Sequence, residues 1–200
     1  MHVKALISLI CPRCGADLQG LDSDNLFACS ECALVYEPNA DGLGGPYPLR
    51  QSPHRPEGLN IALPFWRMKL EPMLLPEGIH APEYAYIPAF DVRRRAFFGD
   101  PGMKWTVDQL IIAAEAPRRP LLGMTLGSAE AEELATYYVM KALDVQKDIT
   151  GFDYEIRFSE TMVMLVEFTD EDTVLVDPVT QERYGATAFC DLPVLRAHRV

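Results

Sequence analysis

The sequence lacks the long apolar runs, the repeats and the export signals that mark helical membrane proteins, solenoids and secreted proteins. No apolar run approaches the roughly 20 residues that cross a bilayer as a helix, and no segment repeats or has low complexity. The apolar stretch near the N-terminus runs straight into Cys11 without a small-residue cleavage site. We therefore expect a strand there, not a signal peptide, and no membrane span.

Familiar catalytic motifs are also missing. The segment Gly42-Leu43-Gly44-Gly45 lacks the lysine and the helix that follow a phosphate-binding loop. No nucleophile elbow is present, and none of the 4 histidines lies in a recognisable metal or catalytic motif. The sequence therefore offers no recognisable set of catalytic residues. We expect the protein to be a binding protein more than an enzyme.

Basic residues are scarce. The chain of 200 residues contains 18 basic and 29 acidic residues, which gives a formal net charge of −11. Residues 1–36 hold only 2 bases against 4 acids, and four thiolates around one divalent ion would add negative charge there. Nucleic-acid binding depends on Lys and Arg that neutralise phosphates, so the N-terminal region is poorly suited to it. Hydrophobic residues make up 48% of the chain, which is enough for a globular core.

Four of the 5 cysteines form two C-x2-C pairs, Cys11/Cys14 and Cys29/Cys32, with 14 residues between the pairs. Two thiolates three positions apart on a tight turn can point at one ion, about 2.3 Å from each sulfur. In a chain without export signals such pairs indicate metal ligands, and hence a reducing, cytoplasmic setting. Two disulfides, or an iron ion in a rubredoxin-like site, are the alternatives that the spacing leaves open.

This cysteine pattern and the short apolar segments around it closely resemble the zinc-ribbon family over residues 5–37. The resemblance implies that Cys11, Cys14, Cys29 and Cys32 hold a structural Zn2+ in a closed, four-coordinate site without an open position. With the segments Leu63-Pro64-Phe65-Trp66-Arg67 and Pro88-Ala89-Phe90, the chain is also similar to uncharacterised bacterial proteins that contain a zinc ribbon. That second likeness implies no activity.

The composition predicts three parts: a zinc ribbon over residues 1–36, a Pro/Gly-rich linker over 37–58 and an α+β domain over 59–200. Nine of the 24 residues in 37–60 are Pro or Gly, which predicts that this stretch holds neither a helix nor a central strand. The expected fold class is α+β, with the N-terminal zinc ribbon followed by an antiparallel sheet and two helices.

Hydrophobic periodicity predicts the elements of the second part. Thr106 and Gln109 fit a capping box and predict a helix over 106–116, and Ser128 is a favourable N-cap for a helix over 128–146. Pro64 suggests that its strand lies at an edge or carries a bulge. Alternation or apolar runs predict strands over 59–70, 84–90, 152–158, 162–168, 173–176 and 182–184.

Three functions are compatible with these observations. The first is a zinc-binding interaction or assembly protein with a protein partner and no catalysis. The second is nucleic-acid binding, for which Arg93, Arg94 and Arg95 are the candidate contacts with phosphates or with an acidic partner. The third is an enzyme whose site lies unrecognised within residues 60–200.

Overall fold

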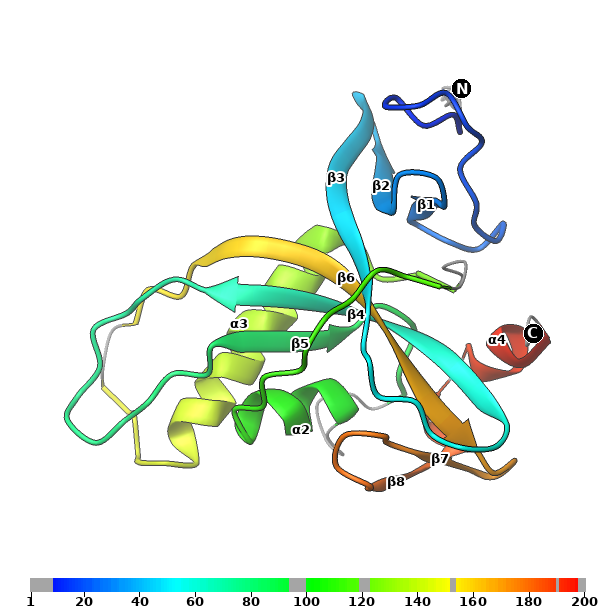
Figure 1. The fold of residues 1–200 in the computed structure, drawn as a ribbon. Helices are drawn as coiled ribbons and strands as arrows, with labels where there is room; N and C mark the ends of the chain where they lie inside the picture. Colours follow the sequence, from blue (N-terminus) through cyan, green and yellow to red (C-terminus); the bar gives the residue numbers. More distant parts are fainter. Residues whose placement is uncertain (1–8, 94–99, 119–122, 152–153, 190, 198–200) are drawn as a thin grey trace, which may run out of the picture.

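The computed structural model describes residues 9–93, 100–118, 123–151, 154–189 and 191–197. Their strands form one 8-stranded sheet in the order β1-β2-β3-β6-β4-β5, with β7 and β8 continuing from β6 (Figure 1). The strands are β1 (Phe27–Cys29), β2 (Leu34–Asn39), β3 (Gly42–Gln51), β4 (Asn60–Leu70), β5 (Tyr84–Pro88), β6 (Phe158–Asp170), β7 (Val174–Val176) and β8 (Arg183–Gly185). The helices in the described residues are α2 (Pro101–Val107), α3 (Ser128–Asp144), the 3-10 turn η1 (Ala186–Ala188) and α4 (Leu192–Ala197).

The antiparallel pair of β4 and β6 forms the centre of the sheet, with register from Asn60 opposite Thr169 to Leu70 opposite Phe158. Successive side chains of β4 enter two different cores, because strand side chains alternate between faces. Trp66 and Met68 belong to the first core, and Phe65 belongs to the second. A strand that is covered on both faces needs apolar residues at almost every position, which explains the sequence of β4.

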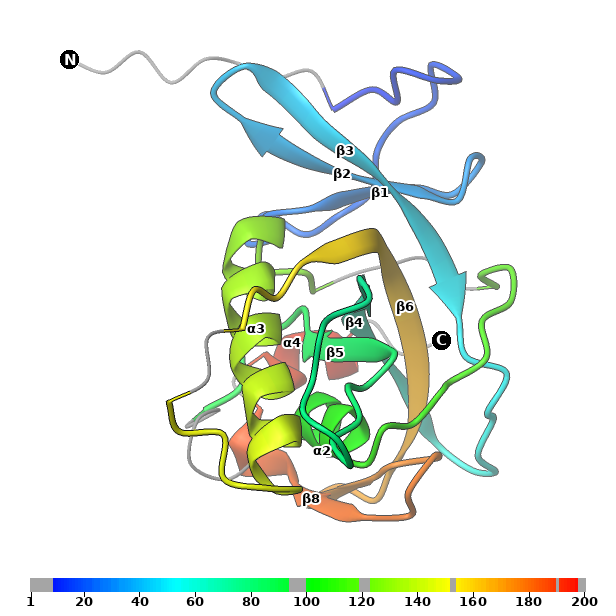
Figure 2. The same ribbon diagram turned by 90° about the vertical axis from the view of Figure 1, so that its left-hand side faces the viewer.

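Helix α3 covers the face of the sheet that carries the first core, and its N-terminal end lies beside β1 and β2 (Figure 2). It buries Ala131, Ala135 and Tyr138 against this first core. Helices α2 and α4 supply Trp105 and Leu192 to the second core. The first core also contains Ala28 of β1, Val35 of β2 and Leu26, which directly precedes β1. The part of the chain that carries the paired cysteines therefore packs on the body of the protein.

The prediction that the Pro/Gly-rich stretch holds no central strand is wrong, because β3 lies between β2 and β6. Its pairing with β2 covers the prolines, for example Pro48 opposite Leu34. Pairing with β6 begins only at Leu49, after the last proline of the strand. A proline removes one N–H, which does little harm where only one neighbouring strand is present. The division into residues 1–36, 37–58 and 59–200 stays a prediction.

The expected antiparallel sheet is also corrected, because β3 and β6 run parallel and the sheet is mixed. Pro64 does not mark an edge strand, since β4 has a neighbour on each side. Its carbonyl accepts from Ala89 N, just beyond β5, so its missing N–H falls where no β5 residue requires a donor. The α+β architecture has three α-helices in the described residues, one more than expected.

The helix expected over 106–116 is wrong, because α2 begins at Pro101 and ends at Val107. Asp100 is the N-cap and accepts from Met103 N, and a proline at the first position suits a helix start. Thr106 lies inside the helix, where its hydroxyl donates to a backbone carbonyl. Gln109 has a φ of 55°, which ends any continuation.

The other expected elements are largely confirmed. α3 begins at Ser128, one residue after its N-cap Gly127, and β4 to β8 fall on the segments that the periodicity indicated. The exception is the strand expected over 152–158. Residues 154–157 form no strand, although Tyr154 and Ile156 pack against the first core; residues 152 and 153 lie outside the described part.

Candidate metal centre

Two backbone turns carry the four cysteines. The first turn closes with Gly15 N donating to Cys11 O, and it ends with Gly15 at a φ of 78°. The second turn ends with Ala33 at a φ of 51°, so both turns use the same left-handed position after the second cysteine. Glycine adopts this backbone conformation freely, whereas in alanine the Cβ lies close to the following carbonyl oxygen, which costs free energy. The two cysteine turns are therefore alike in geometry although their sequences differ.

We expect exchange at this position to have opposite effects in the two turns. Ala33→Gly should raise the free energy of unfolding by up to about 1 kcal/mol, because it removes the left-handed strain. Gly15→Ala should lower it by a similar amount, because the added Cβ meets no atom within 4 Å and only the strain remains. Thermal unfolding of the metal-loaded variants measures both. Equal destabilisation by the two substitutions would contradict the assignment of strain to Ala33.

The four sulfurs converge on one point. The Sγ atoms of Cys11 and Cys32 are 4.0 Å apart, those of Cys14 and Cys29 are 3.6 Å apart, and all four lie within 4.8 Å of one another. A tetrahedral ion with bonds of about 2.3 Å places its sulfurs roughly 3.8 Å apart. A disulfide would need about 2.05 Å. The four cysteines are therefore free thiols that can hold a metal ion, and not two disulfides.

The surroundings of the sulfurs favour a thiolate at Cys11. Burial alone would raise the pKa of this thiol, but the hydroxyl of Tyr36 and the amides of Arg13 and Cys14 outweigh burial and lower it to about 6. The hydroxyl oxygen of Tyr36 lies 3.6 Å from Cys11 Sγ. The contact with Cys14, followed by burial, raises the pKa of Cys32 to about 12. In the absence of a metal the four thiols would not all ionise together, since each charge opposes the next.

The cysteine segment, which we define as residues 9–39, has little apolar core of its own. Only Cys11, Leu18, Cys29 and Tyr36 form its internal buried cluster. Apart from the side chains that it buries in the first core, a small segment of this kind would depend on metal binding for its folding free energy. Because all four ligand positions would be filled by thiolates, the site can stabilise structure but offers no place for a substrate.

Glu37 joins the cysteine segment to α3. Its carboxylate accepts from the amide of Ser128 at 3.2 Å and from the hydroxyl of Ser128 at 2.6 Å. A carboxylate at a helix N-terminus satisfies free amides and complements the helix dipole. In addition, Leu26, Ala28 and Val35 of this segment are buried in the first core. The cysteine segment is thus fixed to the first core and to the start of its covering helix.

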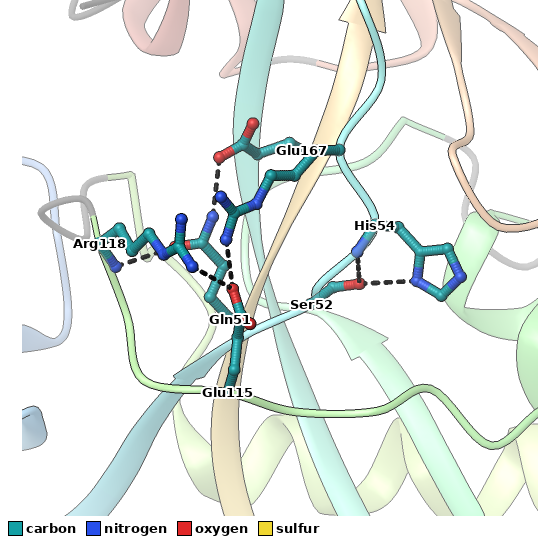
Figure 3. A network of polar contacts seen from close by, with 7 residues as sticks. Gln51, Ser52, His54, Glu115, Arg118 and Glu167 are labelled. Carbon is teal, nitrogen blue, oxygen red and sulfur yellow. Dashed lines mark hydrogen bonds and ion pairs between the residues drawn. The ribbon is translucent and has the colours of Figure 1, made fainter.

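A second polar cluster lies where β3 ends (Figure 3). The fully buried Gln51 donates to Glu167 Oε1 at 2.7 Å and accepts from Arg118 N at 2.9 Å. Its backbone forms an antiparallel bridge with Glu115. Glu115 in turn pairs with Arg55. This cluster ties β3 to β6 and to the segment before α3, so it positions the strand that follows the cysteine segment.

Ser52 and His54 form a close pair in the same cluster (Figure 3), with 3.0 Å between Ser52 Oγ and His54 Nδ1. Ser52 is fully buried and also accepts from His54 N. This is the geometry of a local turn in which a serine hydroxyl binds the backbone two residues on. The buried hydroxyl stabilises the turn and is not accessible as a nucleophile.

The arginine cluster proposed for phosphate contacts is described only in part. Arg93 lies beside η1, since its amide donates to the carbonyl of Ala188. Arg94 and Arg95 lie outside the described residues, as does Cys190. Sequence reasoning missed Tyr36, Glu37 and Gln51, whose partners come from distant segments. No local pattern marks such residues, because each looks like an ordinary strand position.

Comparison with known proteins adds no relative. No protein-family model, curated protein or solved structure matches the chain. The case for a metal centre therefore depends on the chemistry and the spacing of the four sulfurs. Separately, no helix in the described part of the chain combines the length and the apolar character that a bilayer crossing requires.

Proposed function

We propose that the protein is a zinc-binding interaction or assembly protein whose four-cysteine site is structural and whose function is to bind a protein partner. The observation that carries the proposal is the convergence of four thiols within 4.8 Å on a segment with almost no core of its own. A metal ion in such a closed site holds a surface in shape and leaves no open position for a substrate at the metal.

Zinc is the metal that the donor set favours. Four thiolates in a tetrahedral arrangement suit Zn2+ or an iron ion, whereas magnesium and calcium require oxygen ligands. Zinc keeps this geometry without redox chemistry and is the usual ion of closed structural sites. Free thiols of this kind persist in reducing compartments, so we place the protein in the cytoplasm as part of the proposal.

Charge favours a protein partner over a nucleic acid. The chain has a net charge of −11, and residues 1–36 hold only 2 basic residues. A protein that binds phosphates through Lys and Arg loses affinity steeply as salt is raised. We expect no such binding to DNA or RNA at low salt. Salt-dependent binding that disappears when Arg93, Arg94 and Arg95 are neutralised would support the nucleic-acid alternative instead.

The proposed function is tested by recovering the partner and rebuilding the complex. Tagged full-length protein should retain one partner in fixed stoichiometry, and the complex should re-form from purified components. The same complex should be lost with Cys29→Ser and kept with Cys190→Ser, which changes the cysteine outside the two pairs. A solitary chain that forms no complex, whether loaded with metal or stripped of it, would remove the proposal.

A further inference from the structure

Tyr36 lies in β2 and turns its side chain toward the four cysteines. Strand side chains alternate between the two faces, and the residues on either side of Tyr36 face the body of the protein. Val35 is buried in the first core, and Glu37 binds the start of α3. Tyr36 instead packs in the internal cluster of the cysteine segment, together with Cys11 and Cys29. The alternation of β2 therefore aims one aromatic side chain at the metal centre.

The hydroxyl of Tyr36 contacts one sulfur of the four-cysteine site. Its oxygen lies 3.6 Å from Cys11 Sγ, which is a hydrogen-bond distance for an atom as large as sulfur. Tyr36 is only 4% exposed and Cys11 only 1%. A cysteine that binds a metal ion has lost its proton, so the tyrosine hydroxyl is the donor and the thiolate is the acceptor. A charge-assisted hydrogen bond of this kind is stronger than a neutral one, and more so away from water.

Packing alone does not explain this hydroxyl. A phenylalanine would fill the same space without a polar atom that must be satisfied in the interior. A buried tyrosine usually finds a partner for its O–H, and in the described part of the chain that partner is Cys11. The pairing is thus a specific polar contact inside a small and otherwise apolar cluster.

The metal centre would carry an excess of negative charge. Four thiolates and one Zn2+ leave a net charge of about −2, and residues 1–36 supply only 2 basic residues. Hydrogen bonds to the sulfurs are the other means of stabilising that charge. Within the described ranges, Tyr36 provides the one side-chain hydrogen bond to these sulfurs from outside the four cysteines. No other side chain of the described ranges duplicates its contribution.

We propose that Tyr36 is a positioning residue of the metal centre, whose hydroxyl orients the Cys11 thiolate and strengthens metal binding. Outer partners of this kind are worth about 10–100-fold in metal affinity at other sites. The inference rests on the proposed function, in which the site holds zinc. It deepens that function by naming the residue beyond the four ligands that sets how tightly the ion is held.

The first test measures zinc affinity of the full chain by competition with a chelator of known affinity. Tyr36→Phe removes the hydroxyl and keeps the ring, and it should weaken zinc binding about tenfold. Tyr47→Phe is the matched control and should leave the affinity unchanged. Tyr47 lies in β3 opposite Val35, and its ring packs edge-on against Trp66 at 4.9 Å between centroids. In the described part of the chain no hydrogen bond joins it to the four sulfurs.

Cobalt(II) in place of zinc gives a readout that a packing role would not move. The electrons of a thiolate are held more tightly when the sulfur accepts a hydrogen bond, so its charge-transfer absorption to cobalt lies at shorter wavelength. Tyr36→Phe should therefore move this absorption to longer wavelength. 3-Fluorotyrosine is more acidic than tyrosine and hence a stronger donor. Its incorporation throughout the chain should move the absorption to shorter wavelength in the wild type and not in Tyr36→Phe.

Two results would overturn the inference while leaving the metal site in place. One is an unchanged zinc affinity in Tyr36→Phe. The other is a charge-transfer absorption that moves neither in Tyr36→Phe nor with 3-fluorotyrosine, which would reduce Tyr36 to a packing role. If the wild-type chain binds no metal, the inference and the proposed metal site fall together. If the metal and the spectral shifts are both found but no partner complex forms, the inference stands and the proposed interaction fails.

Discussion

Cys29→Ser is expected to abolish stoichiometric metal binding and to unfold the cysteine segment. Cys29 is fully buried, with its sulfur 3.6 Å from that of Cys14. A serine hydroxyl is a poor replacement for a thiolate ligand, and a structural zinc ion contributes on the order of 10 kcal/mol to the folding of a small site. The internal cluster of the segment is too small to replace that contribution.

Hydrogen exchange locates the effect within the chain. Inside the segment, the amides of Ala28 and Gln19 each donate to the carbonyl of the other residue at 2.8 Å. These two amides should lose their protection in Cys29→Ser. The amides of Gln51 and Glu115, each of which donates to the carbonyl of the other residue, should keep more of their protection. Cys190→Ser is the control and should keep both the metal and the protection. Retention of one metal equivalent by Cys29→Ser would contradict the ligand assignment.

The loss should also reach the body of the protein. Leu26, Ala28 and Val35 are buried in the first core together with Trp66, and Glu37 caps α3. Unfolding the cysteine segment would expose this part of the core and remove the cap. We therefore expect a lower melting temperature for the whole chain, and not only a local change. Unchanged thermal unfolding in Cys29→Ser would show that the segment is energetically separate.

Gly102→Ala is expected to have the largest effect away from the metal centre. A Cβ at this position would lie 2.1 Å from the carbonyl oxygen of Tyr86 and 2.8 Å from its carbonyl carbon. These are backbone atoms of β5 and cannot rotate away, so α2 must shift. Overpacking of this kind costs about 3 kcal/mol or more. For a chain of this size the melting temperature should fall by roughly 6–12 °C.

The control for this prediction is Gly185→Ala. Gly185 has a φ of −61°, and its nearest neighbour to an added Cβ is Thr187 Oγ1 at 3.9 Å. Alanine fits there without strain, so the melting temperature should change little. A shift of the same size in Gly102→Ala and Gly185→Ala would mean that α2 does not dock as closely on β5 as the structure shows.

The sequence predicted those features that depend on local spacing. The two C-x2-C pairs indicated that four sulfurs meet, and the structure brings the four Sγ atoms within 4.8 Å. Alternation in the second half of β4 and an apolar run in β6 located these two strands. A favourable residue at the helix start located α3 within one position. In each case the information lies within a few residues of the feature.

Local patterns failed where a distant partner decides the structure. Tyr154 and Ile156 alternate and pack against the core, but residues 154–157 form no strand in the described part of the chain. The prolines of β3 predict a broken strand, but their number does not reveal which edge of the strand is free. Gln51 and Glu167 are 116 residues apart in sequence, so no window of sequence joins them.

The central claim is that the four cysteines hold one zinc ion that stabilises the cysteine segment. Elemental analysis and X-ray absorption at the zinc edge, both on freshly purified full-length protein, test it most directly. We predict one zinc per chain, coordinated by four sulfurs at about 2.3 Å. A protein that is folded over residues 9–39 with no stoichiometric metal, or with a metal bound through oxygen or nitrogen ligands, would contradict the account.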